Sequence, residues 1–341
     1  MTTSNQNGFA LVIVLWVLSL LIIMSGSFAL SMRREASIVE GLKNNAQAGA
    51  IAESALAVAE MMLLQPEAAK RWRADGSIYQ VDFSDTQVRI QLQAEVGKID
   101  INNANEALLQ TLIGRVATDK EQMTKLVNAI LDWRDSDDMV RPDGAEKQEY
   151  KKAGLNYQPR NKRFRTVEEL QMVLGITQEV FETLSPLITV YSGQDVDLRF
   201  APREVLEVLP GLNPEGIEQY LMERTNSAIN ELPMPSTAML TAGALNEDQA
   251  NQAPEDLVQP DEDAAADPAT ETGVFEIIAE AKLENGSSAT LNVQVERIDG
   301  ASSDPFTIIK WQHNLNQKES LFSDEKTKLL VMQYAEPEFN N

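Results

Sequence analysis

The clearest pattern in the chain is an apolar run from Phe9 to Met32, which contains no charged residue and ends before Arg33 and Arg34. Its 24 residues exceed the roughly 20 apolar helical residues that cross a bilayer core about 30 Å thick. The run therefore predicts a transmembrane helix at 9–32. A removable signal peptide would have a basic start, a shorter apolar stretch and a cleavage site after it, so we expect the mature protein to keep this helix.

Apolar residues continue at helical spacing beyond the span. Ile38, Leu42, Ala46 and Val58 fall near one face of a helix, and Pro66 marks its expected end. The span and this amphipathic stretch thus predict one continuous rod, about 80 Å long at about 1.5 Å of rise per residue. Half of the rod would lie in lipid, and the other half would pack on a domain.

After the rod the period of the pattern changes twice. Residues 78–83 and 87–101 alternate apolar and polar positions, which predicts strands with one face on a core. From Asn102 to about Thr225 the spacing becomes helical, with Asn and Thr at plausible helix starts. The expected short helices lie within 102–114, 120–138, 166–175, 177–188, 201–211 and 213–225.

The last third of the chain begins with a strongly acidic stretch. Residues 244–272 hold nine acidic side chains and no basic one, with almost no large apolar group, and so predict a flexible linker. The alternating residues on either side of Asn285 and Gly286 predict a β-hairpin, and 305–312 predicts a third strand. The pattern of the tail is ambiguous, and we expect part of it to be disordered.

Composition excludes several classes of function. The formal charge of −23 disfavours nucleic acid as a partner, because phosphate binding depends on Lys and Arg. The chain contains no Cys, which excludes thiolate zinc sites, redox motifs and cysteine nucleophiles. His313 is the single histidine, so multi-histidine zinc sites are excluded as well, and we expect His313 to be an ordinary surface or strand-end residue.

One group of residues could carry chemistry, an acidic cluster within fifteen positions. Crowded carboxylates repel one another unless a cation neutralises them, and Ca²⁺ is the natural choice for oxygen ligands. An EF-hand loop fits poorly, because Met139 and Val140 occupy the positions of a ligand and of the required Gly. The alternative is a solvated helix end whose acids pair with Arg141, Lys147 and Lys151. The candidate metal ligands are Asp132, Asp135, Asp137, Asp138, Asp143 and Glu146.

A basic group follows the acidic cluster along the chain. We expect it to be a surface of complementary charge rather than a ligand site. Its members are Arg160, Lys162, Arg163 and Arg165.

The start of the chain resembles type IV prepilins and the pseudopilins of type II secretion. Their leaders end in Gly and their mature chains begin with Phe or Met, as at Gly8 and Phe9 here. The resemblance implies that a prepilin peptidase cleaves between Gly8 and Phe9 and that Phe9 is N-methylated. The leader MTTSNQNG lacks the basic residues that such leaders commonly carry. An ordinary single-pass anchor is the alternative interpretation.

Position five of the implied mature chain departs from the usual pilin pattern. Most pilin-like subunits carry Glu there, where this chain has Ile13. In a filament, that Glu neutralises the terminal amine of the neighbouring subunit. The family pattern therefore implies that a subunit with Ile13 has no neighbour above it, as at a filament tip.

Four motifs carry a wider resemblance: KIDINNAN (98–105), AILDWRDSDD (129–138), DGAEKQEY (143–150) and FRTVEELQMVLGI (164–176). Together with the order of the elements, they resemble the K-type minor pseudopilins of type II secretion systems. The resemblance covers nearly the whole chain and is strongest over 98–190. It implies an α+β protein with a pilin-like fold, in which a long N-terminal helix packs on an antiparallel sheet that is interrupted by a large α-helical domain.

The same resemblance implies a function without catalysis. Family members lie at the tip of the periplasmic pseudopilus with the I and J minor pseudopilins, they are anchored in the inner membrane by one helix, and they are associated with calcium. The implied organisation is a leader (1–8), a transmembrane helix (9–32), the first pilin-like part (33–103), the inserted helical domain (104–240), an acidic flexible linker (241–272), the second pilin-like part (273–320) and a C-terminal tail (321–341).

Two other functions remain open at this point. Residues 99–114 with 164–176, and again 197–217, resemble helix-hairpin-helix or SAM-like modules, which often clamp a DNA backbone. A membrane-anchored DNA-uptake receptor would need a basic hairpin surface, whereas this region is acidic. A periplasmic hydrolase that uses paired acids from 132–146 is the third possibility, but nothing in the sequence indicates a substrate pocket.

Overall fold

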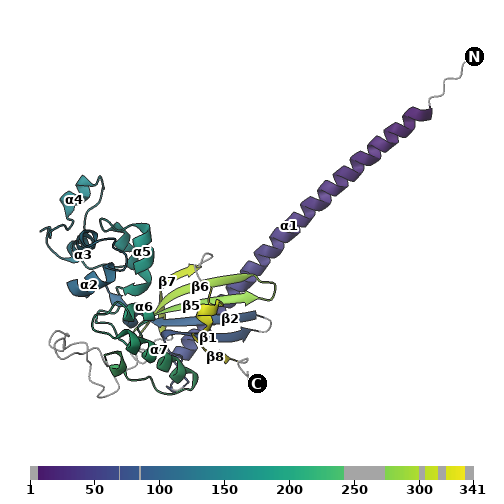
Figure 1. Ribbon diagram of the computed structural model, residues 1–341. Coiled ribbons are helices and arrows are strands. Elements are labelled where there is room, and N and C mark those ends of the chain that lie inside the picture. The colour runs from purple at the N-terminus through teal and green to yellow at the C-terminus, as the bar shows by residue number, and fades with distance from the viewer. Residues whose placement is uncertain are drawn as a thin grey trace, which may run out of the picture.

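The computed structural model describes residues 7–68, 70–83, 86–241, 273–298, 304–313 and 320–334. It consists of a long helix, a sheet against one half of that helix, and a group of shorter helices at the far end of the sheet (Figure 1). Most of the expected leader, the acidic linker from 242 onward and residues 335–341 lie outside the described residues.

Helix α1 (Asn7–Leu63) forms the predicted rod as one unbroken helix of 57 residues, and it ends shortly before Pro66. Its first half extends away from the rest of the molecule, and its second half crosses β2, β5 and β6 (Figure 1). Most of the buried face is alanine, at Ala48, Ala52, Ala55 and Ala59, and the larger Leu56, Met62 and Leu63 join it towards the end of the helix. Because alanine adds little bulk, the helix lies close to the sheet and buries its apolar surface there.

The sheet has six strands in the order β7-β6-β5-β2-β1-β8. The predicted hairpin is confirmed, with its turn at Asn285 and Gly286, where Gly286 adopts a φ of +86° that favours glycine. The strands are β1 (Asp75–Phe83), β2 (Thr86–Ala94), β5 (Val274–Leu283), β6 (Ser288–Arg297), β7 (Phe306–His313) and β8 (Leu330–Tyr334).

One feature of the sheet differs from the expected antiparallel arrangement, whereas its interruption by a helical domain is confirmed. Strand β8 pairs with β1 in parallel, so the sheet is mixed, and the tail contributes helix α8 (Asp324–Thr327) as well as this edge strand. Strand β2 pairs with β5, from Thr86 opposite Leu283 to Ala94 opposite Phe275, although the helical region separates them in sequence. The helices are therefore an insertion between two neighbouring strands.

The expected strand at 87–101 is wrong as one strand beyond Ala94. Strand β2 ends at Ala94, a 3₁₀ turn η1 (Glu95–Gly97) follows, and β3 (Ile99–Asp100) pairs in parallel with β4 (Ile188–Thr189) in a separate two-stranded sheet. Gly97 lies so close to the backbone of Phe200 and Ala201 that no side chain fits between them. This tertiary contact, which the alternating pattern does not reveal, ends the strand.

The inserted helices begin mostly where the sequence predicted. The side chains of Asn105, Asp119, Thr177 and Asn213 each accept a hydrogen bond from a backbone N–H in the first turn. The segment predicted as a helix at 166–175 is a 3₁₀ helix, and α4 was not predicted. The elements are α2 (Glu106–Ile113), α3 (Lys120–Arg134), α4 (Lys147–Lys152), η2 (Val167–Met172), α5 (Gln178–Leu184), η3 (Ser185–Leu187), α6 (Arg203–Leu206), α7 (Pro214–Ile229) and η4 (Thr237–Leu240).

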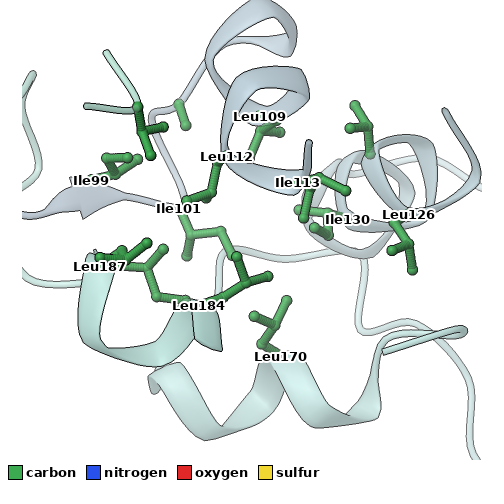
Figure 2. Close-up of a cluster of buried hydrophobic side chains, with 14 of the residues drawn as sticks. Ile99, Ile101, Leu109, Leu112, Ile113, Leu126, Ile130, Leu170, Leu184 and Leu187 are labelled. Atoms are coloured by element: carbon green, nitrogen blue, oxygen red, sulfur yellow. The ribbon is translucent and has the colours of Figure 1, made fainter. Parts of the chain in front are cut away.

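The insertion has a hydrophobic core of its own. In Figure 2, Ile101 from the end of β3 lies among Leu112 of α2, Leu184 of α5 and Leu170 of η2, all of which are fully buried. Burying one such side chain contributes about 1.5 to 3 kcal/mol. A second core between α1 and the sheet contains Ile90, Leu92, Phe275 and Val293.

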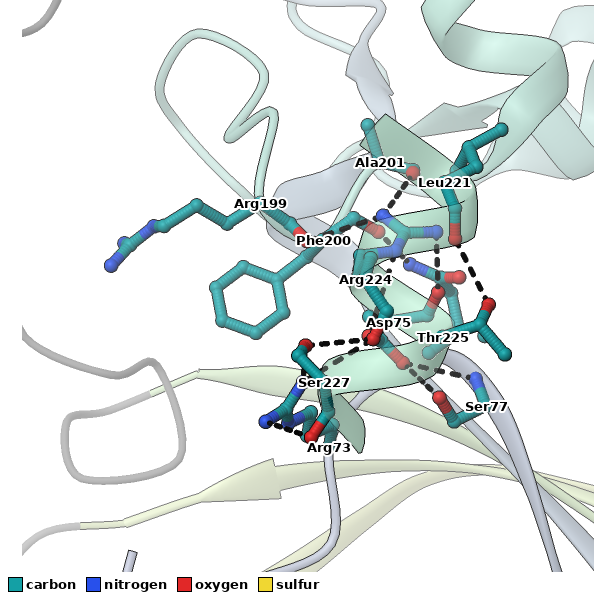
Figure 3. A network of polar contacts seen from close by, with 12 residues as sticks. Arg73, Asp75, Ser77, Arg199, Phe200, Ala201, Leu221, Arg224, Thr225 and Ser227 are labelled. Carbon is teal, nitrogen blue, oxygen red and sulfur yellow. Dashed lines mark hydrogen bonds and ion pairs between the residues drawn. The ribbon is translucent and has the colours of Figure 1, made fainter. Parts of the chain in front are cut away.

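Polar contacts join the two cores. The guanidinium of Arg224 on α7 donates to the carbonyl oxygens of Ala201 at 2.8 Å and Asp75 at 3.2 Å, and its Nε lies 3.6 Å from Asp75 Oδ2 (Figure 3). Lys98 donates to Glu95 at 2.8 Å and to Glu276 at 2.7 Å. Because these groups are buried, each pair constrains how the insertion meets the sheet.

Candidate functional site

The first candidate site is the exposed surface of the N-terminal half of α1. Its apolar side chains, among them Leu11, Trp16, Ile22 and Phe28, lie exposed along the extended part of the helix. This helix is long and apolar enough to cross a membrane, with a mean hydropathy of 2.6 in a window that is 0% buried by the rest of the molecule. Exposed apolar side chains without polar neighbours fit a membrane anchor.

The expected processing site lies at the very start of this helix. Gly8 and Phe9 belong to the first turn of α1, which begins at Asn7. Ile13 follows within the exposed apolar segment. Cleavage between Gly8 and Phe9 would therefore leave the apolar segment of α1 intact.

The second candidate site is the acidic cluster between α3 and α4. Asp132 lies in the last turn of α3, and Glu146 is the residue immediately before α4. The side chain of Asp132 is fully buried, and its Oδ2 accepts a hydrogen bond from the Ala145 N–H at 2.8 Å. Gly144 packs directly on this carboxylate, where a Cβ would collide with Oδ2. The connecting loop is thus folded back over Asp132.

Glu146 is the most unusual member of the cluster. It is 4% exposed, yet both of its carboxylate oxygens lack a hydrogen-bond partner among the described residues, and the same holds for Oδ1 of Asp135. Burial, reinforced by the charges of Asp132, Asp135 and Asp138, raises the pKa of Glu146 to about 7. Burial also raises the pKa of Asp132 and of Asp135. The site therefore holds more negative charge than its surroundings neutralise.

The structure brings four of the six predicted ligands into one electrostatic group, which consists of Asp132, Asp135, Asp138 and Glu146. Asp137 is exposed, and its charge acts on Asp135. Asp143 is also exposed and adopts a left-handed φ of 59° in the loop.

Arginine supplies part of the compensating charge. Nε of Arg141 lies 3.5 Å from Asp132 Oδ1 and 3.9 Å from Asp135 Oδ2. The alternative interpretation, a solvated helix end, expected such a pair for Arg141 as well as for Lys147 and Lys151. In the parts of the chain that the structure describes, no three Asp, Glu or His side chains are arranged as a ready metal site. The unpartnered buried oxygens of Asp135 and Glu146 nevertheless fit a hard cation, which would supply the missing interactions.

Sequence reasoning missed one member of this site. Asn161, in a left-handed conformation with a φ of 50°, donates through Nδ2 to the Asp137 carbonyl at 2.5 Å and to Asp138 Oδ1 at 2.8 Å. Its own Oδ1 is buried and has no partner among the described residues. The only signal in the sequence was an asparagine between Arg160 and Lys162. It was not sufficient, because Asn161 is distant from the acidic cluster along the chain.

The basic group behaves largely as a complementary surface. Arg160 pairs with Glu169, and Arg163 donates to the Asn103 side chain. Lys162 and Arg165 are exposed. A DNA-uptake receptor is not favoured, because this small group lies beside a larger set of carboxylates that would repel phosphate.

A long N-terminal helix packs its second half on a sheet, and shorter helices are inserted between two neighbouring strands of that sheet. This arrangement defines the class of protein as pilin-like. Within that class, residues 89–193 match the family model described as "Type II secretion system (T2SS), protein K". This segment contains β3, the acidic cluster and the basic group, and it belongs to the protein K family of type II secretion systems.

Two known proteins are similar to this chain. The "Type II secretion system protein K" of Aeromonas hydrophila is 24% identical over 213 residues, which are 54% of this chain and 63% of that protein. The match thus spans less than two thirds of the relative's length. A solved structure described as the GspK-GspI-GspJ complex of the enterotoxigenic Escherichia coli type 2 secretion system resembles 83% of this chain and 98% of that chain, with 16% identity and a TM-score of 0.45.

Proposed function

We propose that this chain is a K-type minor pseudopilin that lies at the tip of a type II secretion pseudopilus, where it initiates and caps assembly. In this role it is a structural subunit without catalysis, and it supports the export of folded proteins across the outer membrane. Its helix anchors it in the inner membrane, and its C-terminal domains lie in the periplasm. The family match over residues 89–193 supports the assignment to type II secretion.

The single observation that carries the tip assignment is the position of the insertion. The inserted helices lie at the end of the sheet that is remote from the N-terminus of α1 (Figure 1). A filament of pilin-like subunits grows by packing such helices side by side, with the folded domains stacked along the axis. An insertion of this size would block the next domain above it, so the subunit ends the stack.

The absence of an acid at position 13 supports the same proposal. Ile13 cannot neutralise the amine of another subunit, whereas a subunit in the body of the filament would need a carboxylate there. Ile13 and the insertion thus both support a position at the filament tip, because a tip subunit has no neighbour above it.

The test of this class is the mature N-terminus. We propose that the prepilin peptidase cleaves between Gly8 and Phe9 and that Phe9 becomes N-methylated. Mass spectrometry of the protein purified from membranes should give a chain that begins with methylated Phe9, and Gly8→Arg should leave the precursor intact and block secretion. An intact Met1 in secretion-competent cells would contradict the proposal.

We propose the I and J minor pseudopilins as partners. Co-purification of the full chain with both, from detergent-solubilised membranes, tests this directly. A matched control is a chain in which residues 104–240 are replaced by a short Gly-Ser linker. If the insertion only blocks the growing end, the control should still bind both partners but should allow longer filaments.

We also propose that the acidic cluster holds a structural Ca²⁺ ion. Asp132, Asp135, Asp138 and Glu146 would supply most of the oxygen ligands, and Asp137 and Asp143 lie on the same loop. The ion would neutralise the carboxylates and fix the loop between α3 and α4. The buried oxygens without partners at Asp135 and Glu146 support this proposal.

A further inference from the structure

A cavity of about 280 Å³ lies where the end of α1, the sheet and the insertion meet, remote from the acidic cluster. The segment after α1 contributes Trp72, the insertion contributes Phe200 and Met234, and β5 contributes Phe275. Small-molecule pockets usually start near 300 Å³. This cavity is therefore large enough for one bulky side chain and too small for most cofactors.

The floor of the cavity is apolar and rigid. Trp72 stacks on Tyr79 with ring centroids 4.2 Å apart and an angle of 4° between the planes. Phe275 is fully buried in the core between α1 and the sheet, and Phe200 is nearly so. These rings form the back of the cavity, and exposed Leu232 and Pro233 with half-buried Met234 form its accessible apolar lining. An apolar group that packs on this lining would gain stability by leaving water.

The polar lining of the cavity is mainly cationic. Arg71, Arg73 and Arg199 line it, against Glu231 as the acidic residue. In Figure 3, the side chains of Arg73 and Arg199 lie on the same side of α7 as the Phe200 ring. Arg199 pairs with Asp197 at 2.6 Å. A cationic lining is unusual in a chain with a net charge of −23.

Arg73 is held by neutral acceptors. It donates to the Ser227 hydroxyl at 2.8 Å and to the carbonyl oxygens of Arg224, Ser227 and Leu232, all of which are neutral acceptors. Within the described ranges no carboxylate lies at ion-pair distance from it. These contacts engage both terminal nitrogens of the guanidinium and leave its Nε–H. A carboxylate at the mouth of the cavity would thus gain a charge-assisted hydrogen bond from this N–H without displacing another acid.

We propose that this cavity binds an acidic peptide segment of a partner protein, with one large apolar side chain on the accessible apolar lining and an adjacent carboxylate on Arg73. The shape selects the apolar side chain, and the charge selects its acidic neighbour. This inference does not depend on the function proposed above, because it uses only the chemistry of the cavity.

The test is isothermal titration calorimetry with the full chain in non-ionic detergent micelles. The probes are acetyl-Asp-Phe-Asp-amide, its neutral analogue acetyl-Asn-Phe-Asn-amide, and acetyl-Asp-Ala-Asp-amide, which lacks the ring. The first probe should bind at least about tenfold more tightly than either analogue, because the neutral analogue loses a charge-assisted hydrogen bond and the alanine analogue loses the apolar surface of the ring. Its affinity should also fall as NaCl is added.

Two variants connect binding to the cavity. Arg73→Gln should weaken binding of the first probe about tenfold and remove its preference over the neutral analogue. Since Arg73 also holds the end of α7, Ala68→Trp provides a second variant, in which an exposed residue of the lining is enlarged to fill the cavity. It should abolish binding, whereas Ala153→Trp, at an exposed position on the insertion, should not.

The results that would overturn the proposal are clear. Equal binding of the acidic and neutral probes would exclude charge recognition, and no binding of any probe would exclude the site. Unchanged binding by Ala68→Trp would place the peptide elsewhere or in the micelle. If N-acetylphenylalanine binds as tightly as the peptide, the cavity recognises a small amphipathic acid rather than a partner segment.

Discussion

Arg224 on α7 lies with its Nε 3.6 Å from Oδ2 of Asp75 at the start of β1, and both side chains are buried. Asp75 also accepts hydrogen bonds from the N–H and the hydroxyl of Ser77. The contact joins the inserted helices to the sheet across a long distance in sequence. Because neither charge faces water, the two groups depend on each other.

The first prediction concerns this contact. Arg224→Met should lower the free energy of unfolding by about 3 to 5 kcal/mol, because it leaves the Asp75 carboxylate buried without its cation. Urea unfolding of the full chain in detergent, followed by circular dichroism, measures the change. The matched control is Arg203→Met, which breaks the exposed pair with Glu218 and should shift the midpoint little. Equal effects of the two variants would contradict this account.

The second prediction concerns calcium. Millimolar Ca²⁺ should raise the melting temperature of the chain relative to EGTA, because it neutralises buried carboxylates that have no partner. Glu146→Gln should remove most of this shift, since it deletes a ligand. Without calcium, the same variant should be at least as stable as the parent near pH 8, because it also removes a poorly solvated charge. A full calcium response in Glu146→Gln would exclude this residue as a ligand.

The third prediction is a pH dependence in the calcium-free chain. The pKa of Glu146 is raised from an unfolded value of about 4.3 to about 7, so the folded state holds the proton more tightly. Protonated Glu146 therefore contributes to the stability of the folded state. This contribution is complete below the unfolded pKa and is lost as pH rises towards 7. Melting temperatures in EGTA should therefore fall between pH 5 and pH 8, and less steeply in Glu146→Gln. Parallel profiles for the two proteins would contradict this assignment.

The fourth prediction concerns the close approach of two backbone segments. In Gly97→Ala the new Cβ would meet the carbonyl of Phe200, and neither segment can move without shifting the joint between sheet and insertion. We expect a loss of about 1 to 3 kcal/mol in unfolding free energy. Gly49→Ala is the control, because no atom lies within 4 Å of its added Cβ. That variant should keep or improve the stability of α1.

Several elements of the fold follow from local patterns. The rod of α1, the hairpin at Asn285 and Gly286, and strand β7 lie where the sequence predicts them, because each depends on periodicity or turn chemistry within a short window. The capped starts of α2, α3, α5 and α7 are equally local.

Other elements depend on partners far away in the sequence. Strand β2 ends at Ala94, shortly before Gly97 packs against the backbone of Phe200. Strand β8 forms by pairing with β1. Within 166–175, Val167–Met172 form a 3₁₀ helix against the insertion core, where Leu170 is buried. None of these contacts leaves a periodic signal.

The candidate sites divide in the same way. The sequence alone determined the apolar segment 9–32 and the presence of six acids within fifteen positions, since composition and spacing are sufficient to recognise both. Only the tertiary structure decided that Glu146 is buried without a partner, that Asn161 joins the cluster, and that Trp72, Phe200 and Phe275 form one cavity floor. The reason is physical: burial and convergence are properties of packed surfaces, which form only after distant segments of the chain meet.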